Sequence, residues 1–227
     1  MAFPLSATVF LFCGVVSLYL FARTYTLWRA TKSDLAADLA GFFSFCVFGF
    51  FITGIAALLF PQDPVRLGIY GYSMAWIFYP LAFVFLIRAT LRTYFPRLFG
   101  AIQTLYYVVS AVALGAIYWL IFTTPHLSIV DEFGLTHVRM PLLGYLPAML
   151  VLLGLGIPGS FLFFRAASTV RPGRVRSFFL GFGILVASIG GTGVIAFDSS
   201  LPLFLSFLSL GLGFLFLVLA SVVGPKR

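Results

Sequence analysis

Charged residues are scarce in this sequence. Only 9% of its 227 residues are Asp, Glu, Lys or Arg, and 62% are hydrophobic, whereas an average soluble domain has roughly 25% charged residues. A soluble protein needs a charged surface to stay dispersed, and this chain has too little charge to form one. We therefore expect lipid to act as the solvent for much of its exterior.

Cysteine is also rare: Cys13 and Cys46 both lie inside apolar runs. A disulfide framework would place its cysteines in loops exposed to an oxidising compartment. We therefore interpret these two as small buried hydrophobic residues.

Histidine is limited to one polar stretch, Thr123–Met140, which contains His126 and His137 beside Asp131 and Glu132. Imidazole and carboxylate groups can bind a divalent metal when they converge on one point. These four residues have no regular helical spacing that would bring them together. We predict a solvated loop here and no metal site.

Seven apolar stretches are each long enough to cross a membrane, since about 20 apolar residues span a hydrocarbon core of about 30 Å. Their bounds are Leu5–Ala22, Leu39–Phe60, Leu67–Ile87, Phe99–Phe122, Pro141–Phe164, Ser177–Phe197 and Leu201–Val223. The segments between them are too short to hold a soluble domain. The sequence therefore predicts a single domain over residues 1–227, an all-α integral membrane bundle of seven transmembrane helices.

None of the seven stretches contains Lys, Arg, Asp, Glu or His, and this argues against several functions. Proton relays, ion-coupled pumps and haem-binding bundles need ionisable groups within the membrane, and a retinal protein needs a Schiff-base lysine. Residues Gly71–Ala75 look like a fragment of a serine nucleophile motif, but no span supplies a histidine or lysine as its base. We expect no enzyme activity, no catalytic residues, no cofactor and no bound metal.

Basic residues indicate the orientation, because Lys and Arg concentrate in cytoplasmic loops. With the N-terminus outside and the C-terminus in the cytoplasm, only Arg66 and Arg139 of the 14 basic residues lie outside. The cytoplasmic ones are Arg23, Arg29, Lys32, Arg88, Arg92, Arg97, Arg165, Arg171, Arg174, Arg176, Lys226 and Arg227. The net charge of +8 therefore indicates contact with anionic lipid headgroups and not with nucleic acid.

Two stripes of polar and aromatic side chains suggest a pocket within the bundle, because each has the spacing i, i+4, i+7 that occupies one helix face. The third predicted helix contributes Tyr72, Trp76 and Tyr79, and the fourth contributes Gln103, Tyr107 and Ser110. Buried Tyr and Trp side chains seek a hydrogen-bond partner, and Gln103 is the most polar side chain in any span. We expect the two stripes to meet near the bilayer centre, either as interhelical contacts or as the lining of a small-ligand pocket.

Small residues in the sixth predicted helix indicate close helix packing. Gly183, Ala187 and Gly191 recur every four residues, a spacing that lets neighbouring backbones approach in lipid. We expect a close crossing inside the bundle, and a homodimer face is the alternative.

The order of the helices also suggests an internal repeat. The first three stretches run in the same direction as the last three, on either side of the fourth. Leu20–Arg23 aligns with Leu162–Arg165, and the same offset pairs Gly41 with Gly183. A three-one-three repeat is therefore one hypothesis.

The short inner loops are rich in arginine, the junction Leu162–Gly181 carries several of these arginines, and Leu201-Pro202-Leu203 opens the last stretch. Together with seven spans and an external N-terminus, these features resemble the seven-helix N-terminal sensory region of many bacterial histidine kinases. The resemblance implies a sensory protein of the bacterial inner membrane. Because no kinase domain follows in these 227 residues, it implies a standalone relative that passes its signal to another protein.

Three functions fit these features. The first is a receptor-like or sensory membrane protein without catalytic activity that binds a small ligand in the helix bundle. The second is a facilitative small-solute transporter, because the topology is also similar to that of seven-helix sugar exporters, although Pro4 precedes the first span where that family has a proline signature within it. The third is a structural subunit of a membrane complex, in contact with a membrane or cytoplasmic protein partner.

The orientation can be tested with single cysteines at positions Pro125 and Gly173, introduced into a chain that lacks Cys13 and Cys46. We expect an impermeant thiol reagent to label position 125 in intact cells and position 173 only after the membrane is opened, because the charge bias places them on opposite sides. Labelling of position 173 from outside would contradict the orientation.

Overall fold

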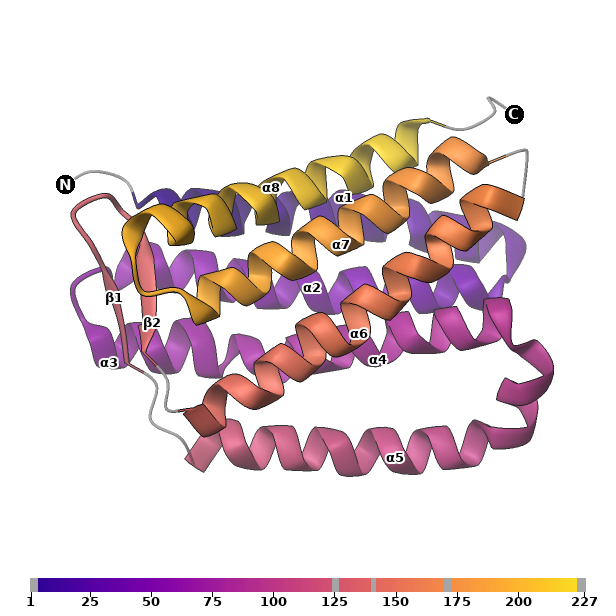
Figure 1. The fold of residues 1–227 in the computed structure, drawn as a ribbon, viewed down its shortest axis with the longest axis horizontal. Helices are drawn as coiled ribbons and strands as arrows, with labels where there is room; N and C mark the ends of the chain where they lie inside the picture. The colour runs from indigo at the N-terminus through magenta and orange to yellow at the C-terminus, as the bar shows by residue number, and fades with distance from the viewer. Residues whose placement is uncertain (1–3, 124–126, 140–141, 170–172, 224–227) are drawn as a thin grey trace.

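The computed structural model describes residues 4–123, 127–139, 142–169 and 173–223, and most of these residues are helical (Figure 1). The long helices are α1 (Leu5–Thr31), α2 (Asp34–Leu59), α4 (Ala75–Tyr94), α5 (Pro96–Thr123), α6 (Leu142–Thr169), α7 (Arg174–Ala196) and α8 (Ser200–Val222). A short helix, α3 (Pro64–Arg66), and a π-helix, η1 (Leu67–Ser73), lead into α4. Within the described residues, six helical segments are long and apolar enough to cross a membrane. This confirms the prediction of a mainly helical chain with apolar helices of membrane-spanning length.

Six of the long helices form a closed ring in chain order. Each of α1, α2, α4, α6, α7 and α8 packs on the next, and α8 closes the ring against α1. The helix α5 lies along one side of this ring, where it packs on α4 and touches α6 (Figure 1). Side chains that point into the ring, such as Phe10, Phe50, Phe207 and Phe214, form the hydrophobic core.

Glycines allow close approach of the helices within each half of the ring. Between α1 and α2, a Cβ on Gly54 would lie 2.8 Å from Leu11. Between α7 and α8, a Cβ on Gly213 would lie 2.5 Å from the backbone nitrogen of Ala187. Helices in lipid gain little from burying apolar surface, so van der Waals contact at such close crossings holds them together.

The two halves of the ring meet at looser contacts. At the seam between α1 and α8, a Cβ on Gly211 would have Val9 as its nearest neighbour, at 3.9 Å. At the seam between α4 and α6, a Cβ on Gly159 would lie 3.7 Å from Leu86. Both are ordinary contact distances. The ring therefore consists of two tightly packed units, α1–α2–α4 and α6–α7–α8, which α5 connects.

The predicted packing residues of the sixth apolar stretch lie in α7. A Cβ on Gly183 would meet the backbone oxygen of Gly213 in α8 at 2.9 Å, and Ala187 lies at the same crossing. Gly191 instead faces Leu152 of α6. Gly41 and its predicted counterpart Gly183 occupy similar places in the two units. Each of these glycines faces the third helix of its own unit. The duplication itself stays a prediction.

The third apolar stretch, Leu67–Ile87, is not one regular α-helix, because it begins with the π-helix η1. The hydroxyl of Thr53 in α2 lies 3.0 Å from the carbonyl oxygen of Gly71, and Ser73 donates to the carbonyl of Gly68 at 3.3 Å. Side-chain hydroxyls thus contact carbonyls of this wider turn. Such π-helical turns frequently occur at functional sites.

Two segments predicted as cytoplasmic loops are mostly helical. In Arg23–Asp38, α1 continues to Thr31 and α2 begins at Asp34, with the turn made at Lys32, whose φ is 53°. Between α4 and α5 only Phe95 is not helical. Hydropathy marks the apolar part of a helix, whereas backbone hydrogen bonding continues through its polar ends.

The segment Thr123–Met140, predicted to lie outside, contains an antiparallel β-hairpin, so the fold is not purely α. Strand β1 (Leu127–Val130) pairs with β2 (Thr136–Arg139), and Gly134, with φ of 74°, provides the left-handed residue of the turn. The prediction of a solvated loop is wrong. The hairpin packs on the ring, and Leu135 is only 1% exposed.

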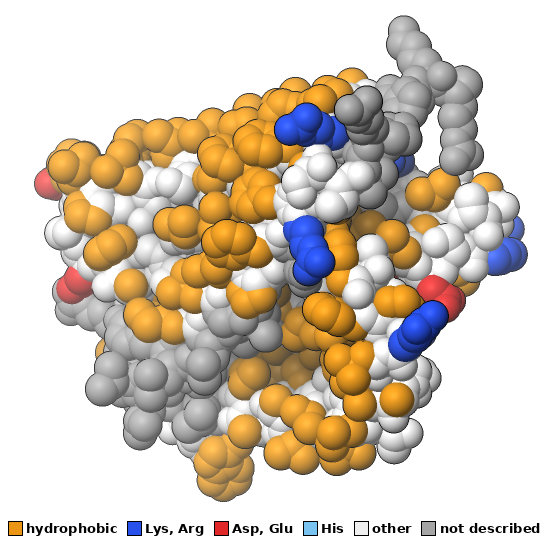
Figure 2. Space-filling model, turned by 45° about the vertical axis from the view of Figure 1, so that its right-hand side comes forward, with side chains coloured by type: hydrophobic (Ala, Val, Ile, Leu, Met, Phe, Trp, Pro, Cys, Tyr) orange, Lys and Arg blue, Asp and Glu red, His pale blue; other side chains and the backbone are white. Residues whose placement is uncertain are grey.

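Basic side chains gather at the end of the ring opposite the hairpin. Helices α1, α4 and α6 end there, and α2, α5 and α7 begin there. Figure 2 shows Lys and Arg side chains at this end, beside a surface that is otherwise largely hydrophobic. The fold therefore brings the arginine-bearing segments together at one end.

The glycine contact between α7 and α8 can be tested with Gly213→Ala. The added methyl group would press on the backbone of Ala187, so we expect a loss of about 1–3 kcal/mol of stability, as for other overpacked sites. Thermal unfolding in detergent measures the loss. The matched control is Gly211→Ala, two residues earlier in α8, where the methyl group has space and removal of a helical glycine should be neutral or stabilising by up to about 1 kcal/mol. Equal effects of the two substitutions would contradict this account.

Candidate functional site

A cavity of about 90 Å³ lies inside the ring. All six helices of the ring and η1 contribute to its wall. The lining is mainly aromatic and includes Phe10, Phe42, Phe50, Trp76 and Phe214. None of the described residues that line it carries a charged side chain, so the cavity suits an uncharged occupant.

A few hydroxyl groups provide the polar part of this cavity. Thr53 Oγ1 lies 2.9 Å from the carbonyl oxygen of Gly49, 3.0 Å from that of Gly71 and 3.4 Å from Tyr79 Oη. The Tyr72 side chain is 4% exposed and its hydroxyl has no hydrogen-bond partner. It interacts with Thr136 of the hairpin, but the two hydroxyls do not have the geometry of an ordinary hydrogen bond. A buried, unpaired hydroxyl costs about 1–3 kcal/mol of stability, so a ligand that forms a hydrogen bond with it would recover this free energy.

The six residues predicted to form one pocket do not meet. Tyr72, Trp76 and Tyr79 line the central cavity, as a shared face requires. Gln103 is exposed, and Tyr107 is 41% exposed with its hydroxyl bound to an arginine.

Ser110 lines a different space, an apolar groove between α4 and α5. The expected meeting of the two stripes is therefore wrong. Its cause is the position of α5, which packs on the outer face of α4 while the aromatic stripe of η1 and α4 points into the ring.

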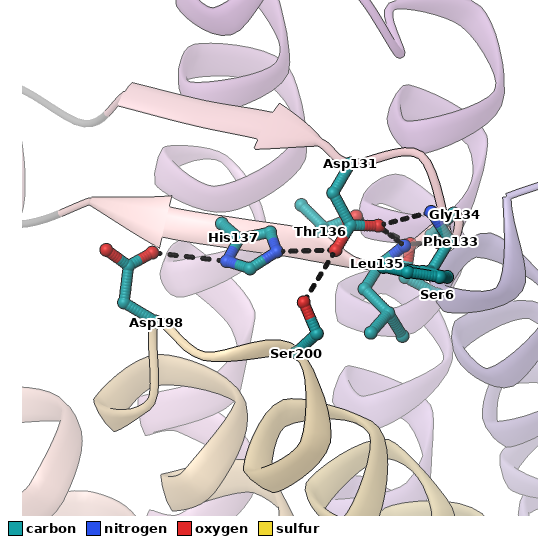
Figure 3. A network of polar contacts seen from close by, with 9 residues as sticks. All are labelled: Ser6, Asp131, Phe133, Gly134, Leu135, Thr136, His137, Asp198 and Ser200. Carbon is teal, nitrogen blue, oxygen red and sulfur yellow. Dashed lines mark hydrogen bonds and ion pairs between the residues drawn. The ribbon is translucent and has the colours of Figure 1, made fainter.

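The hairpin is tied to the helix ring by a polar network at the end of the ring that it covers (Figure 3). Asp131 Oδ1 accepts hydrogen bonds from the backbone nitrogens of Phe133 at 2.9 Å and Leu135 at 2.8 Å, which shapes the hairpin turn. His137 Nε2 lies 2.8 Å from Asp131 Oδ2, and His137 Nδ1 lies 3.1 Å from Oδ1 of Asp198, between α7 and α8. Ser200 Oγ donates to Asp131 Oδ2 at 3.5 Å.

The two imidazole nitrogens of His137 face carboxylate oxygens, which only accept hydrogen bonds. For Asp131, partial burial alone would raise the pKa, but hydrogen bonds from His137 and from backbone N–H groups outweigh it and hold the pKa below its ordinary value. The carboxylates of Asp131 and Asp198 approach opposite sides of the His137 imidazole. In the described chain, no group of three His, Cys, Asp or Glu side chains is placed to hold a metal ion.

The hairpin also covers the N-terminal end of α1. Ser6 Oγ and Thr136 Oγ1 are 2.6 Å apart, and the backbone nitrogen of Ser6 donates to the carbonyl of Gly134 at 3.0 Å. Leu135 and Val138 belong to the same buried core as the residues that line the cavity. The hairpin therefore caps the ring next to Tyr72.

A second charged network lies at the end of the ring opposite the hairpin, between α2 and α4. Arg88 Nε donates to Asp38 Oδ1 at 2.5 Å, Arg88 Nη1 donates to Tyr107 Oη at 3.1 Å, and Arg92 Nη1 lies 2.7 Å from Asp34 Oδ2. The Asp38 side chain is fully buried. Sequence reasoning missed this cluster because it placed these residues in loops. The signal was present, since both the two acids and the two arginines are spaced i, i+4 and so share a helix face.

Comparison with known protein families finds no matching family model, and comparison with curated proteins finds no significant match. The function is therefore inferred from the geometry of this chain's own residues.

The network of Asp131, His137 and Asp198 can be tested by measuring stability against pH in the wild type and in Asp131→Asn. The substitution retains an oxygen for the turn and removes the charge that faces His137. Because the folded pKa of Asp131 is lowered, its charge stabilises the fold above the ordinary aspartate pKa of about 3.9 and this contribution is lost as pH falls through the folded pKa. We expect the variant to unfold at a temperature lower by about 2–4 °C at pH 6, corresponding to about 1 kcal/mol, and the difference to shrink towards pH 2. If the difference in unfolding temperature between the wild type and Asp131→Asn stays the same from pH 6 to pH 2, the charge of Asp131 does not stabilise the fold as described.

Proposed function

We propose that this chain is a receptor-like, sensory membrane protein that binds a small uncharged ligand inside the helix bundle and catalyses no reaction. The observation that carries the proposal is the aromatic cavity with the unpaired hydroxyl of Tyr72. A largely apolar pocket with a few polar groups is the usual form of a small-molecule site. The neighbouring π-helix supports the same position.

The cavity suggests the size and chemistry of the ligand. An engineered apolar cavity of about 150 Å³ binds benzene, so a space of about 90 Å³ fits a molecule no larger than a single small ring. The aromatic wall favours an apolar body, and Tyr72 Oη favours one polar atom on it. An ionised ligand would find no countercharge among the lining residues.

The proposed setting is a cell membrane, with seven transmembrane helices, the N-terminus outside and the C-terminus in the cytoplasm. The gathering of arginines at the end opposite the hairpin supports this orientation. The resemblance to histidine-kinase sensory regions supports a bacterial inner membrane and a protein partner at the arginine-rich face. In this proposal, ligand binding changes how the two three-helix units pack.

A facilitative transporter is the second candidate, favoured by the arrangement of charges. The cavity lies between the His137 network at the outer end and the Arg88 network at the inner end. The looser seams between the two units offer a place for movement. Passage of a small neutral solute into sealed liposomes that contain the protein would favour the transporter over the sensor.

Phenol and benzene can test the cavity, because both have the required size and only phenol has a hydroxyl. We expect phenol to raise the unfolding temperature of the wild type more than benzene does, since binding to the folded state stabilises it. In Tyr72→Phe the advantage of phenol should disappear, while the ligand-free variant should be as stable as the wild type or more stable by about 1 kcal/mol, because an unpaired buried hydroxyl is removed.

The matched control is Tyr70→Phe, in the same π-helix but with a side chain that is 44% exposed. This variant should keep the preference for phenol. If phenol and benzene stabilise the wild type equally, or neither does, the proposed site is wrong.

A further inference from the structure

An apolar groove of about 390 Å³ lies between α4 and α5, on the outer side of the ring. Its α4 wall consists of Pro80, Val84 and Ile87, and its α5 wall extends from Ile102 to Ile117. Of the described residues that line it, only Tyr106 and Ser110 have polar side chains. The groove is separate from the central cavity and larger than it.

Two tyrosines bridge the helices on either side of this groove. Tyr106 Oη donates to the carbonyl oxygen of Val84 at 2.5 Å, and Tyr118 Oη donates to that of Ile77 at 2.7 Å. The hydroxyls are thus satisfied by backbone carbonyls of α4 and are not offered to an occupant. The two tyrosine bridges also limit the width of the groove, because the gap between α4 and α5 cannot exceed the length of one tyrosine side chain.

The helix α5 makes few of the close contacts at glycines that hold the ring together. A Cβ on Gly100 or on Gly115 would meet nothing within 4 Å, in contrast to the tight glycine contacts within each unit. Side chains away from the groove are well exposed, with Val112 at 69% and Trp119 at 71%. The groove is therefore not closed by side chains from α5 itself.

We propose that the groove binds one acyl chain of a bilayer phospholipid. An empty apolar groove forfeits the dispersion contacts of its walls, and these walls provide almost no partner for water. From Ile102 to Ile117 the α5 wall extends about 22 Å at about 1.5 Å per residue, enough for a chain of one leaflet, which occupies about half of the roughly 30 Å core.

The inner end of the groove suits the polar part of such a lipid. Ile87 is followed directly by Arg88, whose guanidinium binds Asp38 of α2 and, at 3.1 Å, Tyr107 of α5. Arginine and tyrosine are typical of the membrane interface. The chain would therefore enter beside this pair and lie along Val84 and Val109.

A transmembrane helix from another copy or another protein does not fit between the two walls. A helix with its side chains is about 10–12 Å across, whereas the tyrosine bridges hold α4 and α5 within one side-chain length. This inference is independent of a ligand in the central cavity and requires only that the chain lies in a membrane.

The test uses the full chain reconstituted in bilayers that contain a phospholipid with a photoreactive diazirine in the middle of one acyl chain. We expect labelling of the groove residues Val84, Val109 and Ala113 to exceed that of the outward-facing Val112 at least fivefold. Ala113→Phe, which fills the groove, should reduce this labelling at least fivefold. The matched control, Ala111→Phe, adds the same bulk on the outward face of α5 and should leave the labelling unchanged.

Native mass spectrometry after detergent extraction provides a second measurement. The wild type and Ala111→Phe should retain one phospholipid that Ala113→Phe loses. If Ala113→Phe does not fold, the labelling pattern of the wild type decides. Equal labelling of the groove and the outward face, or unchanged labelling in Ala113→Phe, would overturn the proposal. Oxidative dimerisation of Ser110→Cys would also overturn it, because that result would place a second copy in the groove.

Discussion

The ring depends on close helix contact at glycines. In lipid the surroundings are as apolar as the helix surfaces, so hydrophobic burial does not drive the helices together and packing must do so. Gly213 against Ala187 and Gly54 against Leu11 show how little space remains at the tight crossings. Because these contacts occur within each three-helix unit and not at the seams, the ring consists of two tightly packed units that meet at looser contacts.

Polar side chains inside the ring follow a second constraint, which is that each hydroxyl needs a partner within the protein. Most use a carbonyl of their own helix, as Thr192 does with Ser188 at 2.8 Å and Ser206 with Pro202 at 2.7 Å. Such local pairing leaves few polar groups for binding. Among the described residues that line the central cavity, Tyr72 has a buried hydroxyl without a partner, as Ser17 has in α1, and Tyr72 belongs to the π-helix that interrupts the regular hydrogen-bond pattern.

Helix α4 has a different environment on each of its faces. Its inner face joins the aromatic wall of the central cavity, and its outer face forms the groove with α5. Its last turns carry Arg88 and Arg92, which bind the acids of α2. The central cavity, the groove and the charged network of Arg88 and Arg92 thus share one helix, so movement of α4 would affect all three.

Local properties of the sequence determined the helices and their approximate bounds, because the length of an apolar stretch depends only on whether each residue along it is apolar or polar. They also determined that Tyr72, Trp76 and Tyr79 share a face, since helical periodicity is local. The spacing of Asp34 with Asp38 already marked a polar helix face, although hydropathy placed it in a loop.

Only the tertiary structure decided which faces meet. Gln103 and Tyr107 point away from the aromatic stripe because α5 lies outside the ring, and no local pattern encodes that position. His137 and Asp198 are 61 residues apart in the chain, and their contact exists because the hairpin folds over the junction of α7 and α8. The cavity, the groove and both charged networks arise between helices, and their geometry depends on the packing of the whole ring.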